Sequence, residues 1–226
     1  MAVHIPFWKR WLSHIIEMEL ENLESEHDHQ LSLCLSDGKI QLNADKAIYS
    51  WEEKYDNFYK AFAQMSFDQL PGDEVLILGF GLGSIAQMLE QKFHKKLQFT
   101  GIEIDEQVIY LAEKYITHQL QSSIQIIQAP AERFIEITES KFDLICVDVF
   151  INTTIPENIK TSAFLQHLKS ALNPGGLILF NHLSHYDTDK QMGEAYFKDI
   201  FSKVFPNSKI VDVDGNYIFF SDLEYL

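Results

Sequence analysis

The sequence predicts an α/β fold with a mostly parallel β-sheet, preceded by a small β extension. From Glu74 onward, short runs rich in β-branched residues alternate with segments whose apolar residues recur at helical spacing, which is the pattern of repeated βαβ units. The first of these runs leads into a glycine-rich loop at residues 79–83. Near the end of the chain, two strand-like runs flank Asp214-Gly215-Asn216, a tight-turn sequence that predicts a hairpin.

The residues before the sheet predict a separate small unit. Residues 30–35 and 39–42 alternate apolar and polar side chains around Asp37-Gly38, which predicts a β-hairpin. Residues 52–67 carry aromatic and apolar side chains at helical spacing, and Pro71-Gly72 then breaks the pattern. We therefore predict a β-hairpin extension with a linking helix over residues 1–70 and the α/β domain over residues 71–226.

The α/β domain is predicted to contain strands that alternate with helices. The strands cover residues 74–79, 97–103, 123–128, 142–148 and 176–181. Residues 84–94 and 106–118 each place their apolar side chains on one helical face, so these two helices are expected to cover the sheet. The final hairpin pairs residues 209–213 with residues 217–220 and brings an antiparallel strand to the sheet.

The composition limits the classes of partner. The chain has 226 residues, of which 46% are hydrophobic, enough for one α/β domain with a well-buried core and a small appendage. Its formal charge of −15 would repel a phosphate backbone, so we expect no nucleic-acid partner. Its apolar runs fall short of the ~20 residues that span a bilayer, so we expect no membrane partner. The acidic surface either keeps the protein soluble or attracts a cationic small molecule such as a polyamine.

The cysteines and histidines do not predict a disulfide or a metal site. Cys34 and Cys146 fall in separate predicted strands, and neither has a CxxC partner. Disulfide scaffolding is therefore not indicated, and a cytoplasmic location fits best. His27-Asp28-His29 supplies two histidine ligands on one short strand without a third or fourth, so we predict no metal there.

The glycine loop and the acid that follows it predict a nucleotide site. Gly79, Gly81 and Gly83 lie between a strand and a helix, where the turn needs unusual backbone angles and where a ligand can approach the backbone. Glu103, at the end of the second strand, can accept hydrogen bonds from both ribose hydroxyls. The spacing G-x-G-x-G rather than G-x-G-x-x-G argues against NAD. A glycine turn followed by a helix-capping acid is the alternative, which explains Asp105 but not Glu103.

At these residues the chain resembles the spermidine synthase family of the class I methyltransferase superfamily. Residues 75–83 are similar to that family's glycine loop, residues 101–112 to its ribose-binding strand and helix, and residues 142–148 to its fourth strand. The resemblance implies a class I methyltransferase-like Rossmann fold with a mostly parallel seven-stranded sheet and a C-terminal antiparallel hairpin strand. It also implies a site for S-adenosylmethionine or its decarboxylated analogue, formed by Gly79, Gly81, Gly83, Glu103, Ile104, Ala131, Glu132 and Asp148.

Three departures from the family pattern concern the chemistry. Leu82 replaces the family's loop aspartate, which binds the aminopropyl amine of the donor, and Ile151 replaces its catalytic aspartate. Loss of a proton acceptor typically costs a factor of about 10²–10⁴. Pro130 takes the place of the adenine-binding aspartate, with Glu132 as a substitute. Methyl transfer depends chiefly on in-line placement of an activated methyl group, so a missing base damages it less.

We therefore expect first an S-adenosylmethionine-dependent methyltransferase that acts on an unidentified small substrate. Aminopropyl transfer from decarboxylated S-adenosylmethionine is the first alternative, and a noncatalytic cofactor-binding or dimerisation relative is the second. A homodimer is a candidate assembly. No catalytic residue is assigned.

Five further residues are candidates near the predicted crevice. Asp148 ends a buried strand at the switch point of the sheet, where it binds a ligand or caps the following loop. Asn181 and His182 follow the fifth strand, and His182 is either a proton acceptor or, as we favour, a loop histidine without a catalytic role. Tyr59 and Lys60 lie where the family's substrate-facing tyrosine and its neighbour fall, and Tyr59 forms either a substrate wall or core packing.

Overall fold

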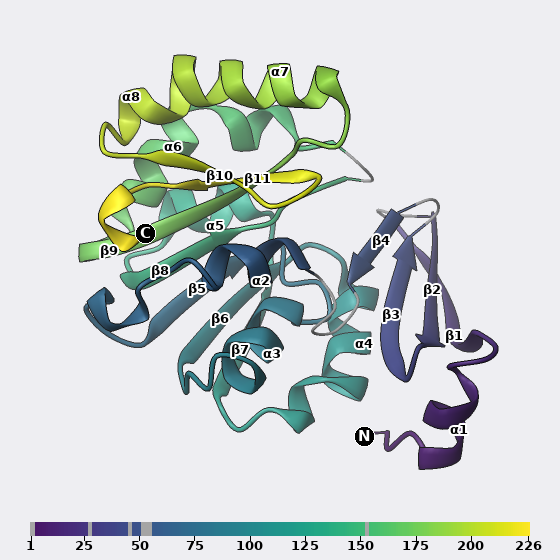
Figure 1. The fold of residues 1–226 in the computed structure, drawn as a ribbon. Coiled ribbons are helices and arrows are strands. Elements are labelled where there is room, and N and C mark those ends of the chain that lie inside the picture. Colours follow the sequence, from purple (N-terminus) through teal and green to yellow (C-terminus); the bar gives the residue numbers. More distant parts are fainter. Residues whose placement is uncertain (1–2, 27–28, 45–46, 51–55, 152–153) are drawn as a thin grey trace.

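Two β-sheets organise the chain (Figure 1). The computed structural model describes residues 3–26, 29–44, 47–50, 56–151 and 154–226. The first sheet is an antiparallel meander of β1 (Met18–Ser25), β2 (His29–Ser36), β3 (Lys39–Ala44) and β4 (Ala47–Ser50). Asp37 and Gly38 turn the chain between β2 and β3 with φ angles of 53° and 78°, which confirms the predicted hairpin.

The second sheet has seven strands, of which one opposes the rest. The strands are β5 (Glu74–Leu78), β6 (Gln98–Glu103), β7 (Ser123–Gln128), β8 (Phe142–Val147), β9 (Leu172–Leu183), β10 (Lys209–Asp212) and β11 (Asn216–Phe220). Their spatial order is β10, β11, β9, β8, β5, β6, β7. Strands β5 to β9 pair in parallel, whereas β11 pairs antiparallel with both of its neighbours. The predicted mostly parallel sheet with an antiparallel strand from the C-terminal hairpin is confirmed.

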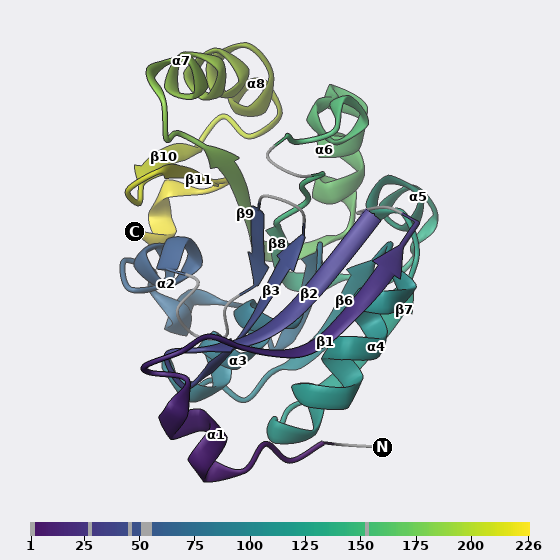
Figure 2. The ribbon, with the colours of Figure 1, turned by 90° about the vertical axis from the view of Figure 1, so that its right-hand side faces the viewer.

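Helices cover both faces of this sheet (Figure 2). They are α2 (Asp56–Phe62), α3 (Ser84–Gln91), α4 (Glu106–Tyr115), α5 (Ala131–Ile137), α6 (Ser162–Ser170), α7 (Asp187–Tyr196) and α8 (Ser202–Val204), while α1 (Phe7–Leu12) precedes the first sheet. Val75 and Ile77 of β5 pack in one core cluster with α3 and α4, whereas Leu76 and Leu78 pack in another with α5 and α6. No helix in the described ranges is long and apolar enough to cross a bilayer.

The N-terminal sheet packs on the face that carries α3 and α4. The residues of β2 that are fully buried in the same core cluster as these helices are Leu31, Leu33 and Leu35. At the start of α4, Asp105 accepts a hydrogen bond from the Ser25 hydroxyl of β1, and near its end Lys114 forms an ion pair with Glu21. Because one core cluster contains residues from both sides of residue 70, the division into residues 1–70 and 71–226 stays a prediction.

Some element boundaries differ from the predicted ones. Helix α3 ends at Gln91 rather than at residue 94, because His94 adopts a positive φ of 54°. Strand β9 begins at Leu172, four residues early, because that residue already pairs with β8. Strand β1 is not predicted, since a bulge between Glu19 and Glu21 interrupts its apolar alternation. The predicted linking helix over residues 52–67 corresponds to α2, which ends at Phe62, and its residues 52–55 lie outside the described ranges.

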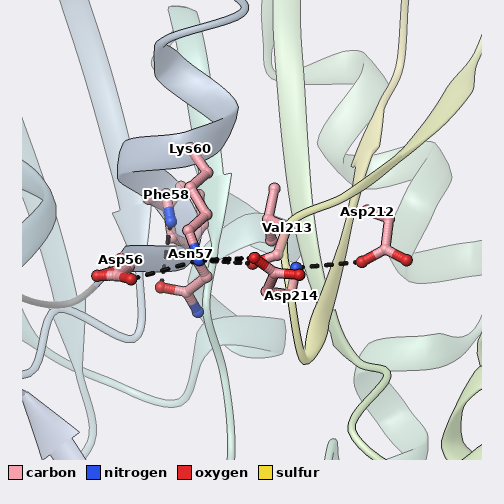
Figure 3. A network of polar contacts seen from close by, with 7 residues as sticks. All are labelled: Asp56, Asn57, Phe58, Lys60, Asp212, Val213 and Asp214. Atoms are coloured by element: carbon pink, nitrogen blue, oxygen red, sulfur yellow. Dashed lines mark hydrogen bonds and ion pairs between the residues drawn. The ribbon is translucent and has the colours of Figure 1, made fainter.

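Lys60 connects α2 with the C-terminal hairpin (Figure 3). Its ammonium group lies 3.3 Å from the Asp56 carboxylate, 3.3 Å from that of Asp214 and 3.4 Å from the Val213 carbonyl. Asp214 begins the turn between β10 and β11 with a positive φ of 61°. Both carboxylates are exposed and Lys60 is half-buried, so each ion pair contributes at most about 1 kcal/mol. These contacts position the turn between β10 and β11, and their contribution to the free energy of folding is small.

Candidate cofactor site

The glycine loop folds back onto the end of β6. The N–H groups of Gly79 and Phe80 donate to the Ile102 carbonyl at 2.9 and 3.0 Å. The loop glycines all have positive φ angles, 81° at Gly79, 53° at Gly81 and 87° at Gly83, and α3 begins at the next residue. The backbone angles predicted to require glycine are therefore confirmed.

Close packing within the protein is a further reason for glycine at two positions, while room for a ligand beside the loop stays a prediction. A Cβ atom on Gly79 would lie 2.2 Å from the Asp148 carbonyl oxygen, and one on Gly83 would lie 2.9 Å from the Phe80 ring. Phe80 is buried and also fills the space beside Gly101, where a Cβ would lie 2.3 Å from the ring. These glycines let the ends of β5 and β8 approach and let Phe80 pack under the loop.

Glu103 directs its carboxylate at the loop. Its Oε2 accepts a hydrogen bond from the Gly81 N–H at 2.9 Å, and its Oε1 accepts from Ile104 at 2.9 Å and Asp105 at 3.2 Å. Burial raises the pKa of this carboxyl above its ordinary value, while the three N–H donors favour the ionised form. Oε2 accepts one of these three hydrogen bonds, and a carboxylate oxygen can accept a second. The glycine loop and Glu103, which together form the predicted nucleotide site, are therefore in contact.

Asp105 has the capping role that the alternative interpretation gives to the acid. It is the N-cap of α4, and its side chain accepts a hydrogen bond from the Gln107 N–H at 2.8 Å. Capping therefore accounts for Asp105 and leaves Glu103 for another role.

The segment after β7 forms the neighbouring wall of the site. The Ala129 N–H donates to the Glu103 carbonyl at 3.0 Å, and α5 begins two residues later at Ala131. Ala131 is buried, Glu132 is partly exposed in the first turn of α5, and Ile104 is 40% exposed next to Glu103. The fold therefore brings these residues to adjacent strand ends, and their contacts with a cofactor stay predictions.

Asp148, which directly follows β8, is held by a chain of two asparagines. The Asn181 amide nitrogen donates to Asp148 Oδ1 at 2.8 Å, and the Asn216 amide nitrogen donates to Asn181 Oδ1 at 2.8 Å. Asn181 is 1% exposed. Because Asn216 occupies the oxygen of Asn181, the amide nitrogen of Asn181 is turned toward Asp148 and orients the carboxylate. Sequence reasoning names Asn181 and misses Asn216, whose place beside β9 depends on the strand order.

Positions 82 and 151, where the resembled family has aspartates, carry apolar residues in this chain. Leu82 is 1% exposed and packs in the core cluster with α3. Ile151 is 56% exposed and forms an isolated β-bridge with Thr154. Both side chains are therefore apolar where an acid would contact the donor or the acceptor.

His182 lies on the opposite face of β9 from Asn181. Its ring packs near Tyr196 of α7 and Phe219 of β11, with ring centroids 6.1 and 5.8 Å apart. Its Nδ1 donates to the Leu183 carbonyl at 2.8 Å, and burial lowers its pKa. Because β9 extends to Leu183, the prediction that Asn181 and His182 follow the fifth strand in a loop is wrong. The absence of a catalytic role for His182 stays a prediction.

The remaining candidates lie away from the loop. Tyr59 packs against Phe93, at a ring distance of 5.4 Å, beyond the end of α3 that is farthest from the glycines. Lys60 is engaged with the C-terminal hairpin. His27 and Asp28 lie outside the described residues, so the interpretation of that cluster stays a prediction. Among the residues that are described, no three His, Cys, Asp or Glu side chains form a group that could hold a metal ion.

Comparison with known proteins identifies the fold. Residues 75–176 match the family model of a methyltransferase domain. A polyamine aminopropyltransferase from Vibrio vulnificus is 28% identical over 188 residues, which cover 80% of this chain and 59% of that protein. The crystal structure of spermidine synthase from Thermotoga maritima matches with a TM-score of 0.67 at 19% identity, covering 90% of this chain and 72% of the other. The chain therefore has the class I methyltransferase fold and is similar in sequence to polyamine aminopropyltransferases.

The chain shares its fold beyond that group. Human methyltransferase-like protein 13, solved in complex with SAH, matches with a TM-score of 0.58 at 22% identity, covering 76% of this chain and 82% of the other. The predicted fold class and the resemblance to the family are thus confirmed. The chain spans 31% and 59% of the length of the first two curated relatives, less than two thirds in each case.

Proposed function

We propose that this chain binds S-adenosylmethionine or its decarboxylated analogue and transfers an alkyl group from the sulfonium to a small amine. The observation that carries the proposal is the position of the carboxylate oxygens of the half-buried Glu103, because Oε2 accepts a hydrogen bond from the Gly81 N–H of the glycine loop. Those oxygens would accept the ribose hydroxyls, and the exposed side chain of Ile104 offers apolar surface to the adenine. The neighbour solved with SAH supports this class of ligand.

We propose aminopropyl transfer ahead of methyl transfer, which reverses the order favoured by the sequence. The polyamine aminopropyltransferases among the relatives support this order. The polar side chains described along the ends of β6, β8, β9 and β11 also support it, because they are acids and amides: Glu103, Asp148, Asn181 and Asn216. Carboxylates and amide oxygens suit a cationic sulfonium donor and an ammonium acceptor.

In the proposed reaction, Asp148 holds the acceptor amine and takes its proton. The amine nitrogen forms a bond to the carbon attached to the sulfonium, and the carbon–sulfur bond breaks with its electron pair left on a neutral thioether. The proton that the nitrogen loses passes to the Asp148 carboxylate, which Asn181 orients. Ile151 cannot accept a proton. Among the described residues of the loop that follows β8, we therefore assign the role of proton acceptor to Asp148.

Methyl transfer is the second candidate, and two observations favour it. Leu82 is buried in the core and Ile151 is apolar, so neither supplies a carboxylate for the aminopropyl ammonium or for the acceptor. Methyl transfer needs chiefly placement of the reacting groups, which the loop and Glu103 would provide.

Calorimetry followed by a product assay tests the proposal. We expect heat of binding with S-adenosylhomocysteine and 5′-methylthioadenosine, because both carry the adenosyl part. Incubation with decarboxylated S-adenosylmethionine and putrescine should then yield spermidine by mass spectrometry. Absence of binding to either nucleoside would refute the cofactor site. Binding without product from either donor on a panel of amines would instead support the noncatalytic alternative.

A further inference from the structure

Gln87 of α3 is a buried polar side chain whose amide group is unpaired. The residue is 1% exposed, and neither its Oε1 nor its Nε2 atom has a hydrogen-bond partner among the described residues. Buried amides in folded proteins almost always form hydrogen bonds, because burial of an unpaired polar group costs free energy. A ligand or a water molecule completes the hydrogen bonds of such a group.

The surroundings of this glutamine favour an apolar side chain. Its neighbours in the sequence, Ala86 and Met88, are fully buried, and α3 lies in the same core cluster as β2. A methionine would fill a similar space without an unpaired amide. Glu90, one turn later on α3, shows the usual arrangement, since its carboxylate accepts hydrogen bonds from the N–H groups of Gln121 and Ser122. Packing therefore gives no reason for an amide at position 87.

The Gln87 side chain lies toward the end of α3 that meets the glycine loop. Its backbone N–H donates to the Gly83 carbonyl at 2.9 Å, so the residue stands one helical turn after the last loop glycine. Side chains of an α-helix lean toward its N-terminus and cover the residues three and four positions before them. For Gln87 these residues are Ser84 and Gly83. The unpaired amide is therefore directed toward the glycine loop.

Both donors named in the proposed function carry an ammonium group within reach of this position. In S-adenosylmethionine and in its decarboxylated analogue, four bonds separate the sulfur from the ammonium nitrogen, a span of about 5 Å when extended. One turn of an α-helix rises about 5.4 Å. A donor whose ribose contacts Glu103 and whose sulfur lies beside the loop can therefore bring its ammonium group to the amide one turn into α3.

We propose that Oε1 of Gln87 accepts a hydrogen bond from the ammonium group in the tail of the donor. This inference rests on the proposed function and adds a residue that recognises the tail rather than the adenosyl part. An amide oxygen accepts from an ammonium group, and the acids at the ends of β6 and β8, Glu103 and Asp148, favour a cation over an anion. Gly81 is partly exposed, which leaves the loop open to solvent.

Calorimetry with two ligands separates the tail from the nucleoside. S-adenosylhomocysteine and 5′-methylthioadenosine share the adenosyl part, but only the first carries an ammonium group. Gln87→Met should raise the dissociation constant of S-adenosylhomocysteine about 10- to 100-fold and change that of 5′-methylthioadenosine by less than about twofold. As a matched control, Gln91→Met makes the same substitution at an exposed position of the same helix and should change neither.

A third ligand identifies the group that Gln87 contacts. S-adenosyl-3-thiopropylamine keeps the ammonium group of S-adenosylhomocysteine and lacks its carboxylate. Gln87→Met should weaken the binding of both ligands equally. A loss of affinity for S-adenosylhomocysteine alone would assign the contact to the carboxylate and overturn the proposal, as would equal losses for all three ligands or no loss for any. A wild-type chain that binds none of the three would refute the cofactor site itself, and this inference with it.

The stability of the ligand-free protein gives a readout that is independent of binding. Because Gln87→Met removes an unpaired buried amide, the variant should melt roughly 2–4 °C higher than the wild type. Gln91→Met should leave the melting temperature unchanged. A lower melting temperature for Gln87→Met would show that the amide is already paired in the ligand-free protein, which would contradict the premise of the proposal.

Discussion

Replacing Glu103 by Gln should weaken binding of adenosyl ligands without unfolding the protein. The carboxylate accepts one N–H on Oε2, from Gly81, and two on Oε1, from Ile104 and Asp105. In glutamine an NH2 group replaces one carboxylate oxygen. The fewest hydrogen bonds are lost when this NH2 group takes the place of Oε2, because only the bond from Gly81 then disappears and the remaining oxygen still accepts from Ile104 and Asp105. Each such bond contributes about 1.5–3 kcal/mol.

The predicted effect on affinity follows from that geometry. The atom turned from acceptor to donor is also one that a ribose hydroxyl would use, so the dissociation constant for S-adenosylhomocysteine should rise about 10- to 100-fold. Titration calorimetry measures it, with Glu106→Gln as a control that removes the same charge from an exposed position in the first turn of α4. A dissociation constant for Glu103→Gln within twofold of the wild type, measured on folded protein, would refute the role of Glu103.

The pH dependence of S-adenosylhomocysteine binding, measured by titration calorimetry, tests Glu103 a second time. Burial raises the pKa of the Glu103 carboxyl, so its ionised form is lost on acidification at a higher pH than for an ordinary glutamate. Its contribution to folding stability is present below the ordinary pKa and is lost as the pH rises through the raised value. Affinity should therefore fall with acidification in the wild type and stay nearly flat in Glu103→Gln.

Three further predictions concern the surroundings of the site. Gly101→Ala places a Cβ 2.3 Å from the Phe80 ring and should destabilise the protein by about 1–3 kcal/mol in urea unfolding, whereas Gly101→Ala/Phe80→Leu should recover most of that loss. Asn181→Leu removes the donor to Asp148 and should weaken putrescine binding while leaving S-adenosylhomocysteine affinity nearly unchanged; equal losses for both ligands would contradict the assignment. Because burial lowers the pKa of His182, the stability it contributes above an imidazole's ordinary pKa of about 6.5 is lost as the pH falls through the lowered value, and His182→Gln should flatten the melting temperature over that window.

The sequence predicts the parts of the fold that depend on local pattern. The short runs rich in β-branched residues that form β5 to β8, the glycines at positive φ and the Asp214-Gly215 turn each depend on residues close together in the sequence, and each lies where it was expected. The contact between Gly81 and Glu103 is likewise predictable, because parallel neighbouring strands end at the same edge.

The parts that the sequence does not predict depend on partners distant in the chain. The reason for glycine at position 101 is the Phe80 ring, and nothing near Gly101 in the sequence indicates it. Asn216 reaches Asn181 only because β11 lies beside β9, which local spacing does not determine. The alternation of apolar and polar residues does not indicate β1, because the bulge in this strand shifts the alternation by one residue.

The position of β11 between β9 and β10 has a consequence for the order of assembly during synthesis. Its residues, Asn216–Phe220, leave the ribosome after every other strand of this sheet, yet they form an interior strand. Until they emerge, β9 presents an unpaired edge and β10 has no neighbour in the sheet. A nascent chain therefore cannot complete this sheet before residue 220 is made, and a truncation before Asn216 would remove an internal strand together with the amide that contacts Asn181.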